Sequence, residues 1–439
     1  MRLVLVVPRF PRLSETFIVS KFLGLVDAGW DAHVVCAATE PWDAFPRLAA
    51  RPELRRRVHR TWPHEPAWQA AALWLPAQGE ALARAPRTTA RYWRAAARTG
   101  AGRAARQAHL DATLIALSPD ILHFEFGALA VGRTHLKQRL GCRLSVSFRG
   151  YDLNYVGLDE PGYYDEVWRE ADAVHTLGRD LWARALRRGC PPDKLHALIP
   201  PAVDASAFRP DPERTPDAIG ATRPLRVLSV GRLEWKKGYE YGLEAIRLLK
   251  ARGVSLTYRI LGGGSYLEPL AFARRQMGLE ADVEFLGPRP QAEVQAQLRW
   301  ADVLLHPAVS EGFGNAVMEA QAMALPVVCS DADGLADNVA DGLTGFVVPR
   351  RSPAAMAEAL GRLAADPALR RQMGAAGRER VLACFRPEDQ IAAFDRFYRD
   401  VTRAGAPRMN SSDDSRTVSP RHLVAEAADG PCDEGSHAR

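Results

Sequence analysis

The sequence lacks the cysteine patterns that hold small domains together or bind zinc. Its six cysteines are scattered along the chain, without a C-x-x-C pair and without a nearby histidine partner: Cys36, Cys142, Cys190, Cys329, Cys384 and Cys432. This spacing argues against a disulfide framework and against a structural zinc site, and it fits a reducing cytosol. We therefore expect a cytoplasmic protein.

Long apolar runs are also missing. The run at residues 3–7 ends at Pro8, which leaves it too short for the apolar core of a signal peptide. No stretch approaches the roughly 18 apolar residues that a membrane span needs. We interpret residues 3–7 as a buried first strand.

Acidic residues are scarce in one segment. Between Arg51 and Arg106 there are twelve arginines against three glutamates, a local balance of +9 in a chain whose formal net charge is +6. The segment also carries aromatic residues: Trp62, Trp68, Trp74, Tyr92 and Trp93. Basic helices with tryptophan are typical of proteins at the inner, anionic face of a membrane. Arginine-rich solvated helices from a high-GC genome would look the same. Nucleic acid is a weaker third interpretation because no recognition motif accompanies the charge, and we expect no nucleic-acid partner.

The chain of 439 residues, 47% hydrophobic and 25% charged, is too long for one ordinary core and predicts two domains. A strand, loop, helix, strand pattern opens at residue 3 and again at residue 225, which predicts an α/β fold of two Rossmann-like, doubly wound parallel-sheet domains. The expected parts are a first domain at 1–205 with an Arg-rich helical insert at about 51–106, a linker at 206–224, a second domain at 225–386, a closing helix at 387–403 and a disordered tail at 404–439.

Two glutamates eight positions apart mark the second half. Glu311 follows an apolar run, and we place Glu319 about two turns into the next helix. Carboxylates accept hydrogen bonds from vicinal hydroxyls, which suits Glu319 to a ribose and Glu311 to a sugar. Helix-start N–H groups suit an anion, and small glycines let a ligand approach the backbone. Further contacts are expected from Gly312, Phe313, Gly314 and Asn315.

Two cations stand five positions apart in a glycine-bounded loop, Arg232 and Lys237 after Gly231. Fixed cations stabilise the charge that grows on a leaving diphosphate, and they can replace a metal in that role. A sugar nucleotide combines a diphosphate with a ribose, a base and a sugar. Its base could lie along Leu286 and Gly287 and against the stretch from Gly262 to Gly264. The Asp-x-Asp at 331–333 resembles a metal site, but we place it on the far side of the helix that carries Glu319, as a loop N-cap. We expect neither a metal nor another cofactor.

The first half carries candidate residues at its strand ends. Ser14, Glu15, Thr16 and His123 are candidates for contacts with a second substrate, the acceptor of the transferred sugar. Arg149 and Asp152 are candidate catalytic residues. Each has a structural alternative: Ser14 could cap a helix, His123 could be a core histidine, and Arg149 could pair with Asp152. The segment 342–348 is expected to form a short hairpin.

The motifs together resemble family 4 of the retaining glycosyltransferases, which have the GT-B fold. The matching stretches are Val230-Gly231-Arg232-Leu233 through Lys237-Gly238, Leu261-Gly262-Gly263-Gly264, Val283-Glu284-Phe285-Leu286-Gly287, and Ser310-Glu311-Gly312-Phe313-Gly314 to Glu319. The opening Phe10-Pro11 to Ser14-Glu15-Thr16-Phe17 is similar to the exopolysaccharide, colanic-acid type branch of that family. The resemblance implies two Rossmann-like domains that face a cleft, with a C-terminal helix that returns to the first domain.

The resemblance also implies roles and an activity. Arg232 and Lys237 would bind the donor diphosphate, Glu319 the ribose, and Glu311 the transferred sugar. The enzyme would be a hexosyltransferase that moves a sugar, with retention, from a nucleotide-sugar donor to a glycan or polyprenyl-linked acceptor in exopolysaccharide or cell-surface glycan biosynthesis. Where many relatives have His-Gly-x-Asp, this chain has Arg149-Gly150-Tyr151-Asp152. We hypothesise that Arg149 supplies a cation near the departing phosphate or the acceptor.

Other functions share parts of this pattern. A nicotinamide dehydrogenase would also have Rossmann halves, but residues 230–234 lack the G-x-G-x-x-G fingerprint. A nucleotide-sugar epimerase and a non-catalytic scaffold or sugar-binding subunit stay open as alternatives. Both glutamates and both cations are present, which favours an active transferase.

Overall fold

The structure, a computed structural model, describes residues 1–12, 15–211 and 223–403. Ser14, most of the expected linker and the expected tail at 404–439 lie outside the described residues. The chain divides into two compact units. The first comprises Met1–Thr176, Trp182–Ile199 and the segment that begins at Ile391, and the second comprises Leu177–Leu181 and Pro200–Gln390.

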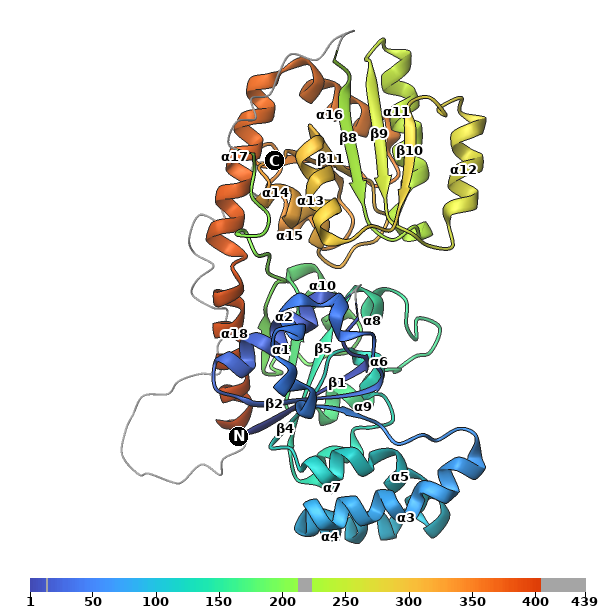
Figure 1. Ribbon diagram of the computed structural model, residues 1–439, viewed down its shortest axis with the longest axis vertical. Helices are drawn as coiled ribbons and strands as arrows, with labels where there is room; N and C mark the ends of the chain where they lie inside the picture. The colour runs from blue at the N-terminus through green and yellow to red at the C-terminus, as the bar shows by residue number, and fades with distance from the viewer. Residues whose placement is uncertain (13–14, 212–222, 404–439) are drawn as a thin grey trace, which may run out of the picture. The chain divides into compact units, whose positions relative to one another are not determined.

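In the first unit the described residues form a seven-stranded parallel sheet in the order β3-β2-β1-β4-β5-β6-β7 (Figure 1). The strands are β1 (Arg2–Arg9), β2 (Asp31–Ala38), β3 (Val58–Arg60), β4 (Ile121–Phe124), β5 (Arg143–Phe148), β6 (Ala173–Thr176) and β7 (His196–Leu198). The central strands are almost entirely buried, as expected where helices cover both faces of a parallel sheet. The strand order reverses between β1 and β4, and ligands of doubly wound sheets bind beyond the carboxyl ends of strands at such a point.

The helices of this part of the chain are α1 (Thr16–Asp27), α2 (Pro46–Ala49), α3 (Ala67–Arg84), α4 (Pro86–Ala96), α5 (Ala101–Leu117), α6 (Gly127–Ala130), α7 (His135–Leu140), α8 (Gly150–Asn154), α9 (Asp165–Glu170) and α10 (Arg179–Arg187). Short 3-10 turns at Trp42–Ala44, Pro52–Arg57 and Ala97–Thr99 connect some of them. Helices α3, α4 and α5 pack on one another, and α4 also packs on α7.

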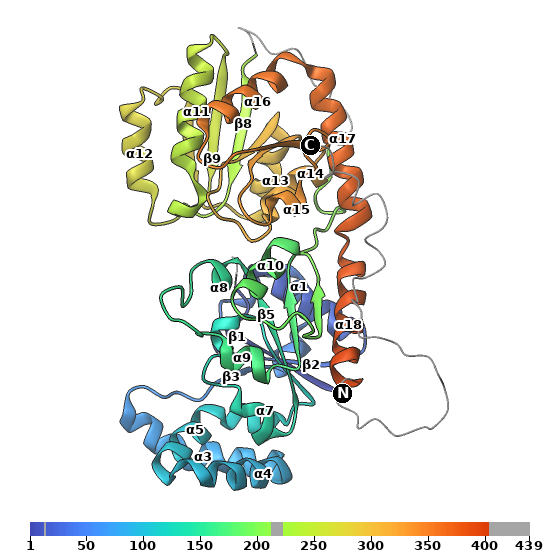
Figure 2. The same cartoon turned by 180° about the vertical axis from the view of Figure 1, so that it is seen from behind.

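The core of the first unit includes α18 (Pro387–Arg403), the last helix of the described residues (Figure 2). Its buried side chains are Phe394, Phe397, Tyr398 and Val401. The Trp30 indole Nε1 donates to Asp395 Oδ1 at 2.9 Å, and the Trp30 and Tyr398 rings meet edge to face at 5.7 Å. The expected return of the C-terminal helix to the first domain is confirmed.

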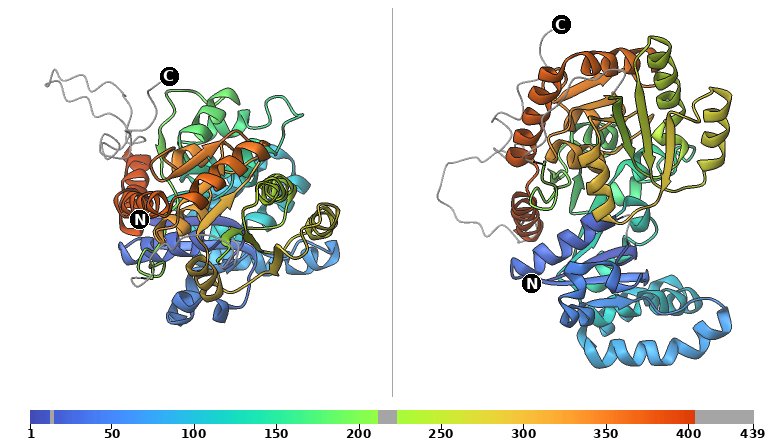
Figure 3. Two further views of the ribbon diagram at one scale, coloured as in Figure 1. Left: turned by 90° about the horizontal axis from the view of Figure 1, so that it is seen from above. Right: turned by 45° about the horizontal axis from the view of Figure 1, so that its top comes forward.

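The second unit holds a six-stranded parallel sheet within the described residues, in the order β10-β9-β8-β11-β12-β13. Helices surround the strands of this sheet (Figure 3). Its strands are β8 (Leu225–Val230), β9 (Leu256–Leu261), β10 (Val283–Gly287), β11 (Val303–His306), β12 (Val327–Ser330) and β13 (Gly345–Val348). Its helices are α11 (Tyr239–Ala251), α12 (Leu267–Gln276), α13 (Gln291–Trp300), α14 (Asn315–Ala322), α15 (Leu335–Asn338), α16 (Pro353–Ala365) and α17 (Pro367–Cys384), with a 3-10 turn at Trp235–Lys237. Here the order reverses between β8 and β11.

Three local expectations are wrong. The Arg-rich insert is not wholly helical, because β3 joins the edge of the sheet by pairing with β2. The segment 342–348 is a turn followed by β13, which pairs in parallel with β12 rather than forming a hairpin. Helix α14 begins at Asn315, so Glu319 lies little more than one turn from its start, not two.

None of the helices in the described residues is both long enough and apolar enough to cross a bilayer. Four cysteines, Cys36, Cys142, Cys190 and Cys329, are buried free thiols.

Candidate functional site

The loops that leave β8, β9, β10 and β11 are bonded into one cluster at the carboxyl ends of these strands. Gly231 N–H donates to Leu261 O at 2.9 Å, and Leu233 N–H donates to Gly263 O at 2.9 Å. Gly262 N–H donates to Gly287 O at 3.0 Å. The sequence therefore brings its glycine motifs together at one edge of the second sheet.

Glycine is required where these loops meet. A Cβ on Gly262 would lie 1.9 Å from Gly231 O, and one on Gly264 would lie 2.3 Å from Leu233 O. Both glycines also have positive φ angles, +146° and +159°. The need for Gly262 and Gly264 is explained first by loop packing, whatever they contribute to ligand binding.

The loop after β8 is joined to the loop after β11 by an ion pair. Lys237 Nζ donates to Glu311 Oε2, and His306 Nε2 lies 3.0 Å from the same oxygen. Burial alone would raise the pKa of the Glu311 carboxyl, but the Lys237 ammonium and the His306 ring hold that pKa well below its usual range. Burial lowers the pKa of His306. Glu311 is therefore an ionised carboxylate bound to a fixed cation.

The second expected cation, Arg232, is more open. Its side chain is 56% exposed, and its Nη1 donates to Glu234 Oε1 at 2.7 Å. Glu234 also accepts from Lys236 Nζ at 2.9 Å. Both expected diphosphate cations thus carry a carboxylate partner in this structure, but only Lys237 is largely enclosed.

The start of α14 presents open backbone donors. Within the described chain, no acceptor is recorded for the N–H groups of Phe313, Gly314 or Asn315. The carbonyl groups of this turn are held by one side chain, because Asn338 Nδ2 donates to Phe313 O at 2.9 Å and to Gly314 O at 3.1 Å. Gln321 Nε2 in turn donates to Asn338 Oδ1 at 2.8 Å. These donors and the helix dipole suit an anion or sugar oxygens.

Glu319 differs from Glu311 in having no counter-charge within the part of the chain that the structure describes. It is half-buried on α14, and no hydrogen bond or ion pair is recorded for its carboxylate among the described residues. Burial raises the pKa of the Glu319 carboxyl to about 7. An accessible carboxylate without a partner is available to accept hydrogen bonds from a ligand.

The expected position of the Asp-x-Asp motif is wrong. Asp333 Oδ2 accepts from Ser310 Oγ and, at 3.0 Å, from Glu311 N–H, so it holds the loop that carries Glu311. It does not cap α15, whose N-cap is Gly334 without a side-chain bond. Arg350 pairs with both aspartates, at 3.1 Å from Asp331 and 3.3 Å from Asp333. No cluster of three or more His, Cys, Asp or Glu side chains in the described ranges is placed to hold a metal.

The residues expected near a base, Leu286 and Gly287, end β10. Leu286 O accepts from Arg289 Nε at 2.9 Å. Gly287 has a left-handed φ of +70°, and a Cβ placed there would meet no atom within 4 Å. This edge of the cluster is open next to the packed glycine loops.

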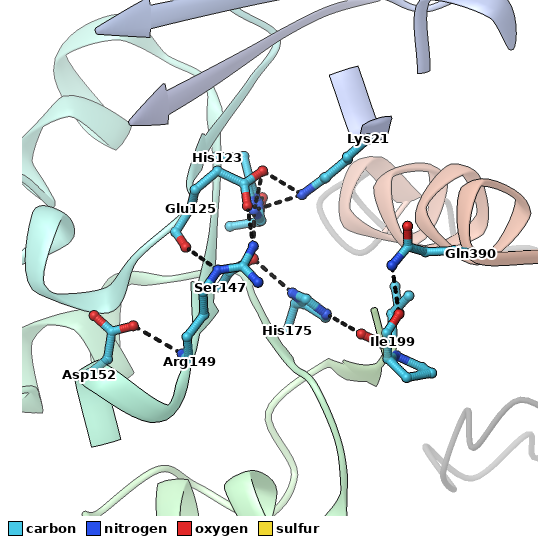
Figure 4. A network of polar contacts seen from close by, with 11 residues as sticks. Lys21, His123, Glu125, Ser147, Arg149, Asp152, His175, Ile199 and Gln390 are labelled. Atoms are coloured by element: carbon cyan, nitrogen blue, oxygen red, sulfur yellow. Dashed lines mark hydrogen bonds and ion pairs between the residues drawn. The ribbon is translucent and has the colours of Figure 1, made fainter. Parts of the chain in front are cut away.

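The first unit contains a buried ionic network (Figure 4). Lys21 Nζ on α1 donates to Glu125 Oε1 at 2.6 Å, and Arg149 Nη2 donates to Glu125 Oε2 at 2.8 Å. Glu125 is fully buried, and its two cations and His123 hold its pKa well below the usual range although burial opposes this. Burial lowers the pKa of Lys21 to about 8, and its ammonium lies 3.9 Å from the Phe394 ring centre.

His123, expected on the acceptor side, is fully buried in this network. Its Nδ1 lies 2.8 Å from Ser145 Oγ and its Nε2 2.8 Å from Ser147 Oγ. Ser147 Oγ contacts His175 Nδ1 at 2.7 Å, and His175 Nε2 lies 2.9 Å from Ile199 O (Figure 4). His123 occupies the position of a core histidine, and no acceptor can reach it there.

Arg149 and Asp152 do not form the side-chain ion pair that was the structural alternative to a catalytic role. Asp152 accepts from the backbone N–H of Arg149 at 2.9 Å and of Ala128 at 3.0 Å, which caps α8. Asp152 is fully buried, burial raises its pKa to about 6, and both its oxygens are occupied by backbone donors. The catalytic expectation for Asp152 is therefore replaced by a structural role. The Arg149 guanidinium lies 4.2 Å from the Phe17 ring centre.

The other acceptor-side candidates lie at the start of α1. Thr16 is its exposed first residue, and Glu15 precedes it and accepts from Arg12 Nη1 at 2.7 Å.

Residues 213–380 match the family model described as glycosyl transferases group 1. The chain is 32% identical over 373 residues to WcaL of Salmonella typhimurium, named as a colanic acid biosynthesis glycosyltransferase, and the match covers 80% of this chain and 88% of that protein. The chain belongs to the group 1 glycosyltransferases.

This glycosyltransferase is also 29% identical over 381 residues to the amylovoran biosynthesis glycosyltransferase AmsK of Erwinia amylovora, covering 83% of this chain and 90% of that protein. It is therefore homologous to exopolysaccharide biosynthesis enzymes. The solved structure of Anabaena HepE in complex with UDP-glucose matches with a TM-score of 0.67 and 15% identity, over 91% of this chain and 100% of that one. That likeness confirms the expected GT-B fold.

The sequence did not identify four residues of the two polar networks described above: His306, Asn338, Lys21 and Glu125. Position was the one local signal, since His306 is the polar last residue of an apolar strand and Glu125 directly follows another. Asn338 and Lys21 lie in helices, where a polar residue is ordinary. Asp333 was noticed as part of the Asp-x-Asp motif, but its bonds to Ser310 and Glu311 were not.

We expect Glu125→Ala to destabilise the first unit by about 3–5 kcal/mol, because it leaves two buried cations without their carboxylate. Glu53→Ala is the matched control, since the Glu53 carboxylate is 51% exposed and pairs with Arg51 at the surface. That change should cost less than about 0.5 kcal/mol. Urea unfolding measures both, and equal losses would contradict the buried-pair account.

Proposed function

We propose that this glycosyltransferase moves a sugar, with retention at the anomeric carbon, from a nucleotide-sugar donor to a glycan or polyprenyl-linked acceptor in exopolysaccharide or cell-surface glycan biosynthesis. The observation that supports a nucleotide-sugar donor most directly is the cluster at the carboxyl ends of β8 to β11. It combines cations, open backbone donors and an unpaired carboxylate at one edge of one sheet. The structurally similar HepE was solved with UDP-glucose bound, which supports the same class of donor here.

Lys237 and Arg232 bind the donor diphosphate in this proposal. The diphosphate competes with the carboxylates that now hold these cations, so its entry weakens the bonds to Glu311 and Glu234. Two cations then take up the charge that develops as the sugar leaves, and the proposal includes no metal. The open N–H groups at the start of α14 take further oxygens of the donor.

The two glutamates have different tasks. Glu311 is held by Lys237 and His306, so it is a rigid acceptor that orients a hydroxyl of the transferred sugar. Glu319, for which the described residues record no partner, accepts from the ribose diol. Retention follows if the donor phosphate assists attack by the acceptor hydroxyl from the face that the leaving group vacates.

Arg149 supplies a further cation in this proposal, near the departing phosphate or the acceptor. Its guanidinium is held at two points by Glu125, through the carboxylate at 2.8 Å and the backbone carbonyl at 3.1 Å. Such bonding fixes the orientation of the cation before any ligand arrives. The glycosyltransferase works in the cytoplasm, at the inner face of the membrane where polyprenyl-linked acceptors are built.

A thermal-shift panel of UDP, GDP, ADP and TDP sugars tests the donor class. At a concentration about 100 times the dissociation constant, the right donor should stabilise the protein by about 2.7 kcal/mol and raise its melting temperature. Transfer of radiolabel from that donor to a membrane extract would then show the activity. No response to any nucleotide sugar would contradict the proposal, and a response without transfer would favour a non-catalytic binding subunit.

The roles of single residues can be separated by kinetics. Glu319→Ala should weaken donor binding, with a loss of about 1–3 kcal/mol for the bonds to two ribose hydroxyls. Glu311→Gln and Arg149→Ala should chiefly lower kcat, because both groups act on the sugar or the leaving charge. Calorimetric donor affinity and steady-state kcat measure the two effects. A normal turnover of Arg149→Ala would remove that residue from the mechanism.

Donor affinity should depend on pH through Glu319. Its pKa is raised to about 7 without ligand, and only the ionised carboxylate accepts from both ribose hydroxyls. Affinity should therefore rise about tenfold between pH 6 and pH 8 and then level off. A nucleotide sugar is the right probe, because both of its phosphates are esterified and neither titrates in this range. The variant Glu319→Gln should show a flat profile, and an equally steep one would refute the assignment.

A further inference from the structure

Helix α3 has an exposed apolar surface, on the side opposite to the one that packs on α5. Three large side chains repeat at intervals of seven residues: Trp68 is 72% exposed, Leu75 is 73% exposed and Leu82 is 56% exposed. Residues seven apart lie on the same face of an α-helix. The other exposed residues from position 69 to position 83 are small or apolar as well: Ala71, Ala72, Pro76, Gly79 and Ala83.

The opposite side of α3 is already packed. Ala77 and Ala81 are fully buried, Trp74 Nε1 donates to Ala105 O on α5 at 2.9 Å, and Gln78 Nε2 donates to Ala108 O at 3.1 Å. The helix is therefore apolar on both sides, although only one side is covered within the described residues. A surface helix normally turns a charged or polar face to water. Contiguous apolar surface of this kind marks an interaction site.

The charge around α3 indicates what covers the exposed face. Residues 51–106 carry twelve arginines and three glutamates. Five exposed arginines on α4, α5 and the turn between them have no ion pair recorded within the described chain: Arg87, Arg94, Arg98, Arg103 and Arg106. Helices α4 and α5 both pack on α3. The helices that pack with α3 therefore carry several positive charges without a recorded counter-charge, and the segment 51–106 as a whole is strongly basic.

We propose that the face of α3 formed by Trp68, Leu75 and Leu82 is a membrane-docking surface, and that its partner is an anionic lipid bilayer. The inference rests on the proposed function, in which the chain works at the inner face of a membrane, and it identifies the residues that make the contact. The helix lies in the plane of the interface with its apolar face among the acyl chains, and the neighbouring arginines meet lipid phosphates. The distance from Trp68 to Leu82 along the helix is about 21 Å.

A second copy of this chain is the less favourable occupant. Pairing two α3 faces would bring together two segments that each carry a local balance of +9, and like charges at such close range repel. An anionic bilayer satisfies both the apolar face and the charge. A bilayer also needs no preformed groove to bind the convex face of a helix.

The test is flotation of the full-length chain with vesicles that contain about one third anionic lipid, at about 0.1 M salt, with purely zwitterionic vesicles as the comparison. We expect the wild-type chain to float with anionic vesicles and to be released by high salt. The double variant Trp68→Glu/Leu75→Glu should lose at least about tenfold in the bound fraction. Phe272→Glu is the matched control, because Phe272 is 66% exposed on α12 in the second unit, and it should float like the wild type.

Two further readouts separate the outcomes. The donor-induced thermal shift should be the same in the double variant and the wild type, since the substituted side chains are exposed and belong to the other unit. A wild-type chain that does not float, or a double variant that floats like the wild type, overturns the docking surface. Sedimentation that shows a wild-type dimer and a monomeric double variant, without vesicle binding, overturns it in favour of a second copy. If nucleotide sugars cause no thermal shift in the wild-type chain, the proposed function is contradicted. The vesicle result would still support the docking surface.

Discussion

Each unit of the chain takes one glutamate carboxylate out of water and compensates it with cations from distant parts of the sequence. Glu125 is held between Lys21 and Arg149, and Glu311 is held by Lys237. Burying a carboxylate costs several kcal/mol unless a well-placed partner offsets the loss of water. The loops at the strand ends must therefore keep the geometry that these pairs require. The orientation of Arg149 depends directly on this geometry, because Glu125 holds its guanidinium at two points.

Glu319 is the exception, and its chemistry differs accordingly. Its pKa rises from 4.5 to about 7 because burial is not compensated by a cation. An acid that holds its proton more tightly in the folded chain contributes stability that is complete below about pH 4.5 and is lost as the pH rises through about 7. At neutral pH the partly ionised Glu319 carboxylate therefore lowers the stability of the fold. In the proposed complex, hydrogen bonds from the donor would offset this cost. Under the proposed function, Glu319 is a binding residue that works against stability, which is a recognised pattern in proteins.

Much of the fold could be predicted from the sequence because buried parallel strands are continuous apolar runs. The strands at 225–230, 256–261 and 303–306 were found for this reason, and the glycine motifs that follow them gave the order of the loops. The segment 58–60 failed the same test, since Val58-His59-Arg60 is too short and too polar to differ from the arginine-rich residues around it. At residues 345–348 the sequence could not distinguish a hairpin from a parallel edge strand, because either one can follow a turn that contains glycine.

The ionic partners could not be predicted because the sequence contains no information on distance between separate motifs. Lys21 and Glu125 are 104 positions apart, and a lysine in an amphipathic helix normally faces water. Asp333 and Glu311 belong to loops that meet only because β11 and β12 are neighbours in the sheet. Motif spacing predicted that the loops of the second unit lie together at one edge of its sheet, as they do in the structure. The hydrogen bonds and ion pairs inside that cluster could be found only from the three-dimensional structure.

The last helix gives the chain an unusual order of assembly. Phe394 and Tyr398 fill the core beside Lys21 and Trp30, so the first unit is discontinuous in sequence and uses residues that follow the second unit in the chain. Domains commonly fold in order as the ribosome releases them, at about 5–20 residues per second. Here the first sheet must wait with part of its apolar surface uncovered until the second unit has been synthesised. The half of the chain that is made first is therefore the half whose core is completed last.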